Sequence, residues 1–98
     1  MSDISVIELE AIPFQYVQFL HQDDEYYVEI RQIGEWLYTS TEVNGERITL
    51  NVRATHGGKL VPYPHAKVST VVRWIDSVGK EDPQYEGLGS RWFLMLES

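Results

Sequence analysis

Two neighbouring segments of the chain show the period-two pattern of β-strands. Residues 14–21 (FQYVQFLH) and 26–33 (YYVEIRQI) are rich in aromatic and aliphatic side chains, and residues two apart lie on the same face of a strand. In 26–33 one face is mostly apolar and the other partly charged, which predicts one buried face. In 14–21 both faces are apolar, which predicts a sheet covered on both sides. The HQDDE run between them supplies a turn.

The next pair of segments predicts a β-hairpin. Residues 35–43 (EWLYTSTEV) are rich in strand-forming types, and the dipeptide Asn44-Gly45 follows them. This dipeptide tolerates the two positive φ angles of a type I′ turn better than other pairs do. The return strand is predicted over residues 46–54 (ERITLNVRA), with alternating apolar and polar positions. Its predicted buried face consists of Ile48, Leu50, Val52 and Ala54, and its predicted solvent face of Arg47, Thr49, Asn51 and Arg53.

The second half of the chain predicts an irregular segment and two more strands. Residues 56–66 (HGGKLVPYPHA) contain two prolines, which cannot donate to a central ladder, so an irregular or edge segment is expected. Residues 67–76 (KVSTVVRWID) predict a strand. The apolar run at 92–96 predicts a central strand buried on both faces, because each large apolar side chain left in water forgoes roughly 1.5–3 kcal/mol of burial. Gly87 and Gly89 permit the turn that brings this strand into the sheet.

These elements predict an all-β fold. No stretch of helical length has the apolar spacing of an amphipathic helix. About six or seven short strands at this spacing are typical of a small antiparallel sandwich or barrel. We find no internal repeat, low-complexity tract or linker, and therefore expect a single β domain over residues 1–98.

Composition limits the class of protein. The chain has 98 residues, 43% hydrophobic, and no cysteine, which excludes a disulfide framework and a thiolate zinc site. Its N-terminus lacks the basic segment and apolar stretch of a signal peptide, and no apolar run is long enough to span a membrane. We expect a soluble protein that is synthesised in the cytoplasm and has no membrane contact.

The charge argues against tight binding to nucleic acid. Fifteen acidic residues outnumber eight basic ones, which gives a formal net charge of −7, and no two basic residues are adjacent. Affinity for phosphate backbones comes mainly from basic side chains that release counterions. A direct DNA-binding role is therefore not expected.

Ligand types for a metal ion are present, but their spacing is poor. His21 and Asp23 lie across a turn, and neither His56 nor His65 has a closely spaced histidine or carboxylate partner. The acidic run at 23–25 lacks the regular loop spacing of an EF-hand. A solvated acidic turn is the favoured interpretation, with no metal and no cofactor.

No catalytic motif is present either. There is no G-x-S-x-G elbow, and Gly57-Gly58 lacks the lysine-serine pair of a phosphate-binding loop. A histidine would reach a serine only through the tertiary fold, and the candidate serines are Ser40, Ser69 and Ser90. Three carboxylates flank the hairpin, which are Glu35, Glu42 and Glu46. Two of them could pair as the catalytic carboxylates of a glycosidase do, but on a charged chain they are expected to serve solubility. We expect no enzyme and no catalytic residues.

The aromatic residues leave one alternative open. Trp74 and Trp92 lie inside apolar strands, where core packing is expected. Trp36, beside Glu35 and close to Tyr38, has no such context. Exposed aromatics would suit a sugar-binding or protein-binding module, and acidity would suit an inhibitor of a basic target. A small acidic protein-binding module or inhibitor is therefore the alternative function.

Several segments form a distinctive set when they are taken in order. ELEAIPFQYVQF (8–19) begins it, followed by the tyrosine-rich strand, VNGERI (43–48), VRATHGGKLVPYP (52–64) and YEGLGSRWFLML (85–96). The characteristic parts are an I-P-x-Q start, a G-x-x-L-x-P-Y middle and a Y-E-x-[LF]-G-[ST] end. With these segments the chain resembles the small baseplate plug domain of contractile-tailed bacteriophages, of the type named from a cyanophage tail.

The resemblance implies a structural component of the virion and no catalysis. It implies a place on the central axis of the tail baseplate, where the domain plugs or lines the channel at the hub and tube until DNA is released. The implied partners are the baseplate hub and the tail tube, with spike and tape-measure proteins as further candidates, and several copies around the axis. The acidic composition agrees with this, because a protein beside a DNA conduit should not bind DNA tightly.

Overall fold

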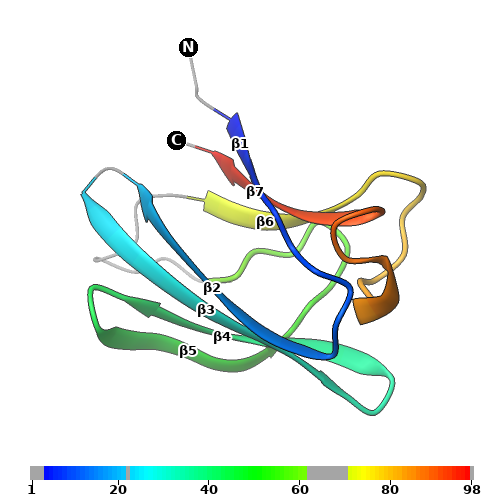
Figure 1. The fold of residues 1–98 in the computed structure, drawn as a ribbon, viewed down its shortest axis with the longest axis horizontal. Coiled ribbons are helices and arrows are strands. Elements are labelled where there is room, and N and C mark those ends of the chain that lie inside the picture. The colour runs from blue at the N-terminus through cyan, green and yellow to red at the C-terminus, as the bar shows by residue number, and fades with distance from the viewer. Residues whose placement is uncertain (1–3, 22, 62–70, 98) are drawn as a thin grey trace.

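Residues 4–21, 23–61 and 71–97 are described by the computed structural model, and they form two antiparallel sheets (Figure 1). The larger sheet has the order β2-β3-β4-β5 and consists of β2 (Phe14–His21), β3 (Asp24–Ile33), β4 (Trp36–Val43) and β5 (Glu46–Arg53). The smaller sheet has the order β1-β7-β6 and consists of β1 (Ile4–Ile7), β7 (Trp92–Glu97) and β6 (Val71–Asp76). A single 3₁₀ turn, η1 (Tyr85–Gly87), is the helical element of these residues. The predicted all-β class is confirmed.

The two sheets enclose one main core. In Figure 1 the strands β1, β7 and β6 lie together on one side of the four-stranded sheet. Both sheets contribute buried side chains to the space between them, which are Val28, Ile30 and Leu37 from the larger sheet and Val72, Trp74, Leu94 and Leu96 from the smaller one. The architecture is therefore a two-layer sandwich. Within the described residues, no helix is both long and apolar enough to cross a bilayer.

The Asn44-Gly45 hairpin turn is confirmed. The φ angles are 53° at Asn44 and 83° at Gly45, as a type I′ turn requires. The Asn44 side chain also holds the neighbouring β2–β3 turn. Its Oδ1 accepts from the backbone N–H of Glu25 at 2.9 Å, and its Nδ2 donates to Asp24 Oδ1 at 2.9 Å. Asn44 therefore connects the β4–β5 turn to the β2–β3 turn.

The C-terminal apolar run forms a central strand, as predicted. Strand β7 lies between β1 and β6 and pairs with both. Its residues Trp92, Leu94 and Leu96 are buried, whereas Phe93 and Met95 are half-buried, so the expected complete cover is found on one face only. At Gly89 the φ angle is 83°, and a Cβ there would collide with the carbonyl oxygen of Leu9. Only glycine fits this approach to the strand.

The N-terminal strand β1 was not predicted from the sequence. It is four residues long and pairs with β7 in antiparallel register, from Ile4 opposite Glu97 to Ile7 opposite Leu94. A segment this short gives little periodicity, and its strand character depends on a partner about ninety residues away.

The predicted alternation of β5 is wrong at its centre. Leu50, which was expected to be buried, is 63% exposed, and Thr49 is only 5% exposed. The pairing of β4 with β5 shifts register around Thr41, and Asn51 has a φ of 51°. Thr49 Oγ1 accepts from the backbone N–H of Thr41 at 3.1 Å, and Ser40 Oγ accepts from that of Asn51 at 3.0 Å. A β-bulge therefore exchanges the sides of Thr49 and Leu50, whereas Ile48 and Ala54 stay buried as predicted.

The irregular segment after β5 runs along the outer edge of β6. Leu60 donates its backbone N–H to Val72 O at 2.9 Å, and Trp74 donates to Gly58 O at 2.9 Å. This agrees with the predicted irregular or edge segment as far as residue 61. Residues 62–70, which include part of this segment and the start of the predicted strand at 67–76, lie outside the described residues.

Candidate interaction surface

The outer face of the larger sheet exposes a row of large apolar side chains. Phe14, Tyr16 and Leu20 of β2 are 45%, 58% and 72% exposed, and Tyr27 of β3 lies beside them, half-buried. We call these four residues the aromatic face. The expectation that β2 is covered on both sides is wrong for the chain by itself, because the smaller sheet covers only the inner face. Large side chains of this kind in one patch mark interaction sites on soluble proteins.

Contacts between neighbouring rings fix the aromatic face in place. Phe14 and Tyr16 meet edge to face with ring centroids 6.1 Å apart, and Tyr16 stacks on Tyr27 with centroids 5.2 Å apart. The guanidinium carbon of Arg31 lies 5.3 Å from the Phe14 ring centroid. Because these rings are already ordered, a partner would lose little conformational freedom in binding them.

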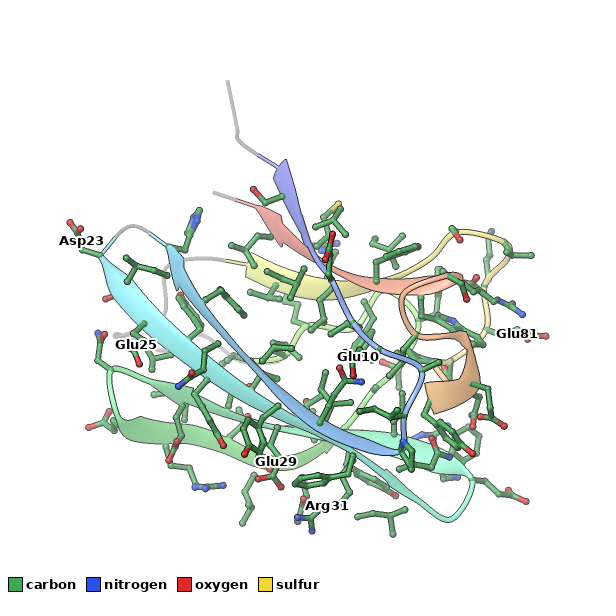
Figure 2. The ribbon with its side chains drawn as sticks, in the orientation of Figure 1. Glu10, Asp23, Glu25, Glu29, Arg31 and Glu81 are labelled. Carbon is green, nitrogen blue, oxygen red and sulfur yellow. The ribbon has the colours of Figure 1, made fainter. Side chains whose placement is uncertain are left out.

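Charged groups border the aromatic face. Arg31 Nη2 donates to Glu29 Oε1 at 2.8 Å. Figure 2 shows both side chains directed away from the smaller sheet. Burial raises the pKa of the Tyr27 hydroxyl, and Tyr16, Glu29 and Glu42 raise it further by charge. The hydroxyl therefore stays protonated at neutral pH and can donate a hydrogen bond to a partner.

Trp36 belongs to the same outer side of the sheet. The guanidinium carbon of Arg53 lies 3.5 Å from its ring centroid, and Arg53 Nη2 donates to Asp82 Oδ2 at 2.9 Å. Trp36 is half-buried under this arginine. Trp74 and Trp92 are 1% and 6% exposed, which confirms their predicted place in the core.

The residues considered as metal ligands are dispersed in the structure. His21 is half-buried at the end of β2, and Asp23 is exposed in the turn with a φ of 67°. Asp24 accepts from Asn44, and the backbone N–H of His56 donates to Asp82 Oδ1 at 2.9 Å. In the described part of the chain, no three histidine or carboxylate groups are clustered as a metal site would need. His65 lies outside that part.

The residues considered for catalysis make local structural contacts. Ser40 accepts from the Asn51 backbone, and the Ser90 hydroxyl donates to Gly87 O at 3.3 Å. Glu42 Oε1 lies 3.8 Å from Arg47 Nη2 across the hairpin. Among the described residues, neither serine is hydrogen-bonded to a histidine. Ser69 lies outside them.

A buried ion pair was not found from the sequence. Arg91 donates Nε to Asp76 Oδ1 and Nη2 to Asp76 Oδ2, both at 2.8 Å, and the Asp76 side chain is fully buried. The backbone N–H groups of Val78 and Glu81 donate to the same carboxylate at 3.0 and 2.9 Å. The hydrogen bonds from Arg91 hold the pKa of Asp76 far below its usual range.

The Asp76–Arg91 pair has a structural role. It joins the end of β6 to the start of β7, where the Arg91 guanidinium carbon also lies 4.4 Å from the Trp92 ring centroid and Trp92 Nε1 donates to Glu81 O at 3.1 Å. Both carboxylate oxygens are occupied by donors from the chain itself. The pair therefore orders the loop beside the core and leaves no acceptor free for a ligand.

Comparison with known families finds a match. A family model described as "Cyanophage baseplate Pam3 plug gp18" matches residues 4–98, which include both sheets and the aromatic face. None of the curated proteins that were compared matches the chain.

Proposed function

The chain belongs to the cyanophage baseplate plug family, and from this premise we propose that it plugs or lines the central channel of a contractile tail at the junction of hub and tube. Family membership makes it a structural component of the phage baseplate, located in the virion tail and associated with other tail proteins. What we propose in addition to family membership is that the domain lies on the tail axis and blocks the tail channel until DNA is released.

The exposed aromatic face is the main observation in support of the proposal, because it indicates that neighbouring proteins cover this side of the domain in the assembled baseplate. Phe14, Tyr16 and Leu20 are exposed together in the isolated chain, and burying such side chains contributes roughly 1.5–3 kcal/mol each. A baseplate protein has neighbours that can cover this surface. The proposed neighbours are the hub and the tail tube, with spike or tape-measure proteins as further candidates, arranged with several copies of this chain around the axis.

The charge supports a position beside DNA. With a net charge of −7, the surface repels the phosphate backbone. A plug that bound DNA tightly would hold back the molecule that it must let pass. We propose that the domain acts by occupying the channel and holding its neighbours, without catalysis, metal or cofactor, after synthesis in the host cytoplasm.

A paired surface experiment tests this proposal. We compare tails made with the double variant Phe14→Ser and Tyr16→Ser with tails made with Val78→Ser, a control that removes an apolar side chain which is 73% exposed in the loop after β6. Both isolated variants should melt close to wild type, because no core side chain is changed. The double variant should be depleted from purified tails, and virions assembled with it should lose DNA early. Wild-type incorporation and DNA retention by the double variant would contradict the proposal.

A further inference from the structure

The free edge of β2 presents a row of unpaired backbone groups. The backbone N–H of Gln32 donates to Pro13 O at 2.8 Å, which sets the phase of the β2–β3 ladder. Because antiparallel strands alternate their hydrogen-bonding sides, the N–H and C=O groups of Gln15, Val17, Phe19 and His21 face β3. Those of Phe14, Tyr16, Gln18 and Leu20 face outward. Within the described residues, no hydrogen bond to these outward groups is found.

The side chains of β2 offer no protection to this edge. Natural edge strands are usually short, charged, bulged or interrupted by proline. Strand β2 has eight residues in regular register with β3, and it contains no lysine, arginine, aspartate, glutamate or proline. Of the four residues with outward-facing backbone groups, Phe14, Tyr16 and Leu20 also belong to the aromatic face. A strand added here would therefore form ladder hydrogen bonds and an apolar contact together.

The net negative charge of the chain lies in the part of the sequence that includes this edge strand. Residues 1–30 contain no lysine or arginine, and the rest of the chain contains eight basic and eight acidic residues. The carboxylates of the first thirty residues are Asp3, Glu8, Glu10, Asp23, Asp24, Glu25 and Glu29. The entire net charge of −7 thus lies in the segment that includes β1, β2 and most of β3.

Carboxylates stand near both ends of β2. The Gln15 side chain donates to Glu10 O at 2.6 Å and accepts from the Glu10 backbone N–H at 3.1 Å, so Glu10 is held beside the start of the strand. Asp23 and Glu25 lie at the β2–β3 turn, at the other end (Figure 2). Glu29 is already paired with Arg31, but no arginine or lysine is hydrogen-bonded to the side chains of Glu10, Asp23 or Glu25 among the described residues.

We propose that an extended, net-basic segment of a neighbouring baseplate chain adds to β2 as a fifth strand of the larger sheet. Its backbone pairs with Phe14, Tyr16, Gln18 and Leu20, its apolar side chains cover the aromatic face, and its basic side chains meet the carboxylates at the two ends. This inference rests on the proposed place in the baseplate. A second copy of this chain is disfavoured as the occupant, because two edges of this kind would bring together two segments of the same strong negative charge.

Hydrogen exchange in assembled tails tests the added strand directly. In the free chain, the amides of Phe14, Tyr16, Gln18 and Leu20 should exchange fast, and those of the alternate residues facing β3 slowly. In purified tails that contain the wild-type chain, the four outward amides should exchange at least about tenfold more slowly. If the chain is present in the tails and these four amides stay fast, the added strand is refuted and the proposed function stands. Absence of the chain from tails refutes the proposed function itself.

A proline variant separates backbone pairing from side-chain contact. Gln18→Pro removes an outward-facing N–H without removing a β2–β3 hydrogen bond, and proline is tolerated on edge strands. Gln18→Ala is the matched control, because it removes the same side chain and keeps the N–H. Incorporation into tails should fall at least about tenfold for Gln18→Pro and stay near wild type for Gln18→Ala. Equal incorporation of both variants would overturn the proposal, and if Gln18→Pro does not fold, the exchange experiment decides.

A charge variant tests the basic character of the added strand. The double variant Glu10→Gln and Asp23→Asn should weaken incorporation, with a larger effect at low salt than at high salt. Glu81→Gln is the control, since Glu81 lies away from β2 in Figure 2 and Arg91 keeps both hydrogen bonds to Asp76. Unchanged incorporation of the double variant at low salt would show that the occupant is not basic.

Discussion

Deletion of residues 92–98 should abolish folding of the domain. The deletion removes the central strand of the smaller sheet, and with it the buried side chains of Trp92, Leu94 and Leu96, which are 6%, 0% and 3% exposed. Removing large buried side chains costs about 2–5 kcal/mol each, so three cost about 6–15 kcal/mol. The whole stability of a small domain is about 5–15 kcal/mol. Strand β1 would also lose its ladder, because it pairs with β7.

Thermal unfolding followed by near-ultraviolet circular dichroism measures the effect of this deletion. Trp36 and Trp74 remain as probes, and Trp74 is packed in the core. The wild-type chain should show one cooperative transition, as expected if residues 1–98 fold as a single domain. The truncated chain should show none. A retained cooperative transition would refute the account and would mean that the segment is an arm that docks on a neighbouring tail protein.

Point variants in β7 test which face of this strand packs in the core. Leu94→Ala should cost about 2–5 kcal/mol, because Leu94 is fully enclosed between the sheets. Met95→Ala should cost clearly less, since Met95 points to the opposite, half-buried face. Equal losses of stability in urea unfolding would contradict the assignment of the two faces.

Three further predictions concern the turn, the ion pair and the edge strand. Gly45→Val should lower the free energy of unfolding by about 1 kcal/mol or more, because φ is 83° at this position. Gly79→Ala should be nearly neutral, because a Cβ at Gly79 would make only ordinary packing contacts. Equal melting temperatures of the two variants would refute the turn. Arg91 lowers the pKa of Asp76, so the pair stabilises the fold above about pH 4 and loses this effect as pH falls further. Acid titration of Asp76→Asn should therefore show a weaker loss of stability below pH 4 than wild type, and parallel curves would contradict this. Gln18→Lys should lower incorporation into tails without changing the melting temperature of the isolated chain, because it places a positive charge opposite a basic strand, and unchanged incorporation would count against a basic strand at β2.

Local chemistry was sufficient to predict the hairpin and the central strand. The Asn44-Gly45 dipeptide favours one turn type through its own backbone preferences, and both residues have the expected positive φ. The apolar run at 92–96 is hard to place anywhere except in a core. In each case the deciding property belongs to neighbouring residues, so no knowledge of the tertiary fold is needed.

The features that were missed depend on residues distant in sequence. Thr49 and Leu50 exchange faces because β4 supplies hydrogen-bond partners to a bulge in β5. Asp76 and Arg91 form an ion pair across a loop, and the sequence around each residue does not show which residue it will pair with. Periodicity alone gives the positions of such residues along a strand but does not give the contacts that decide their burial.

The aromatic face shows a different limit of sequence analysis. Apolar side chains on both sides of β2 predicted a strand that is covered on both sides. The pattern did not say which molecule provides the cover. The chain's own smaller sheet covers one side, and the other side, with Phe14, Tyr16 and Leu20, is left exposed. Family membership is what connects this surface to a baseplate.

A cryo-electron microscopy reconstruction of the assembled tail, before DNA release, tests the central claim most directly. The account predicts density for this domain on the tail axis at the junction of hub and tube. It also predicts that the aromatic face is covered and that an extended strand of a neighbouring chain is paired with β2. Density at the periphery of the baseplate, with an open channel and with Phe14, Tyr16 and Leu20 in solvent, would contradict it.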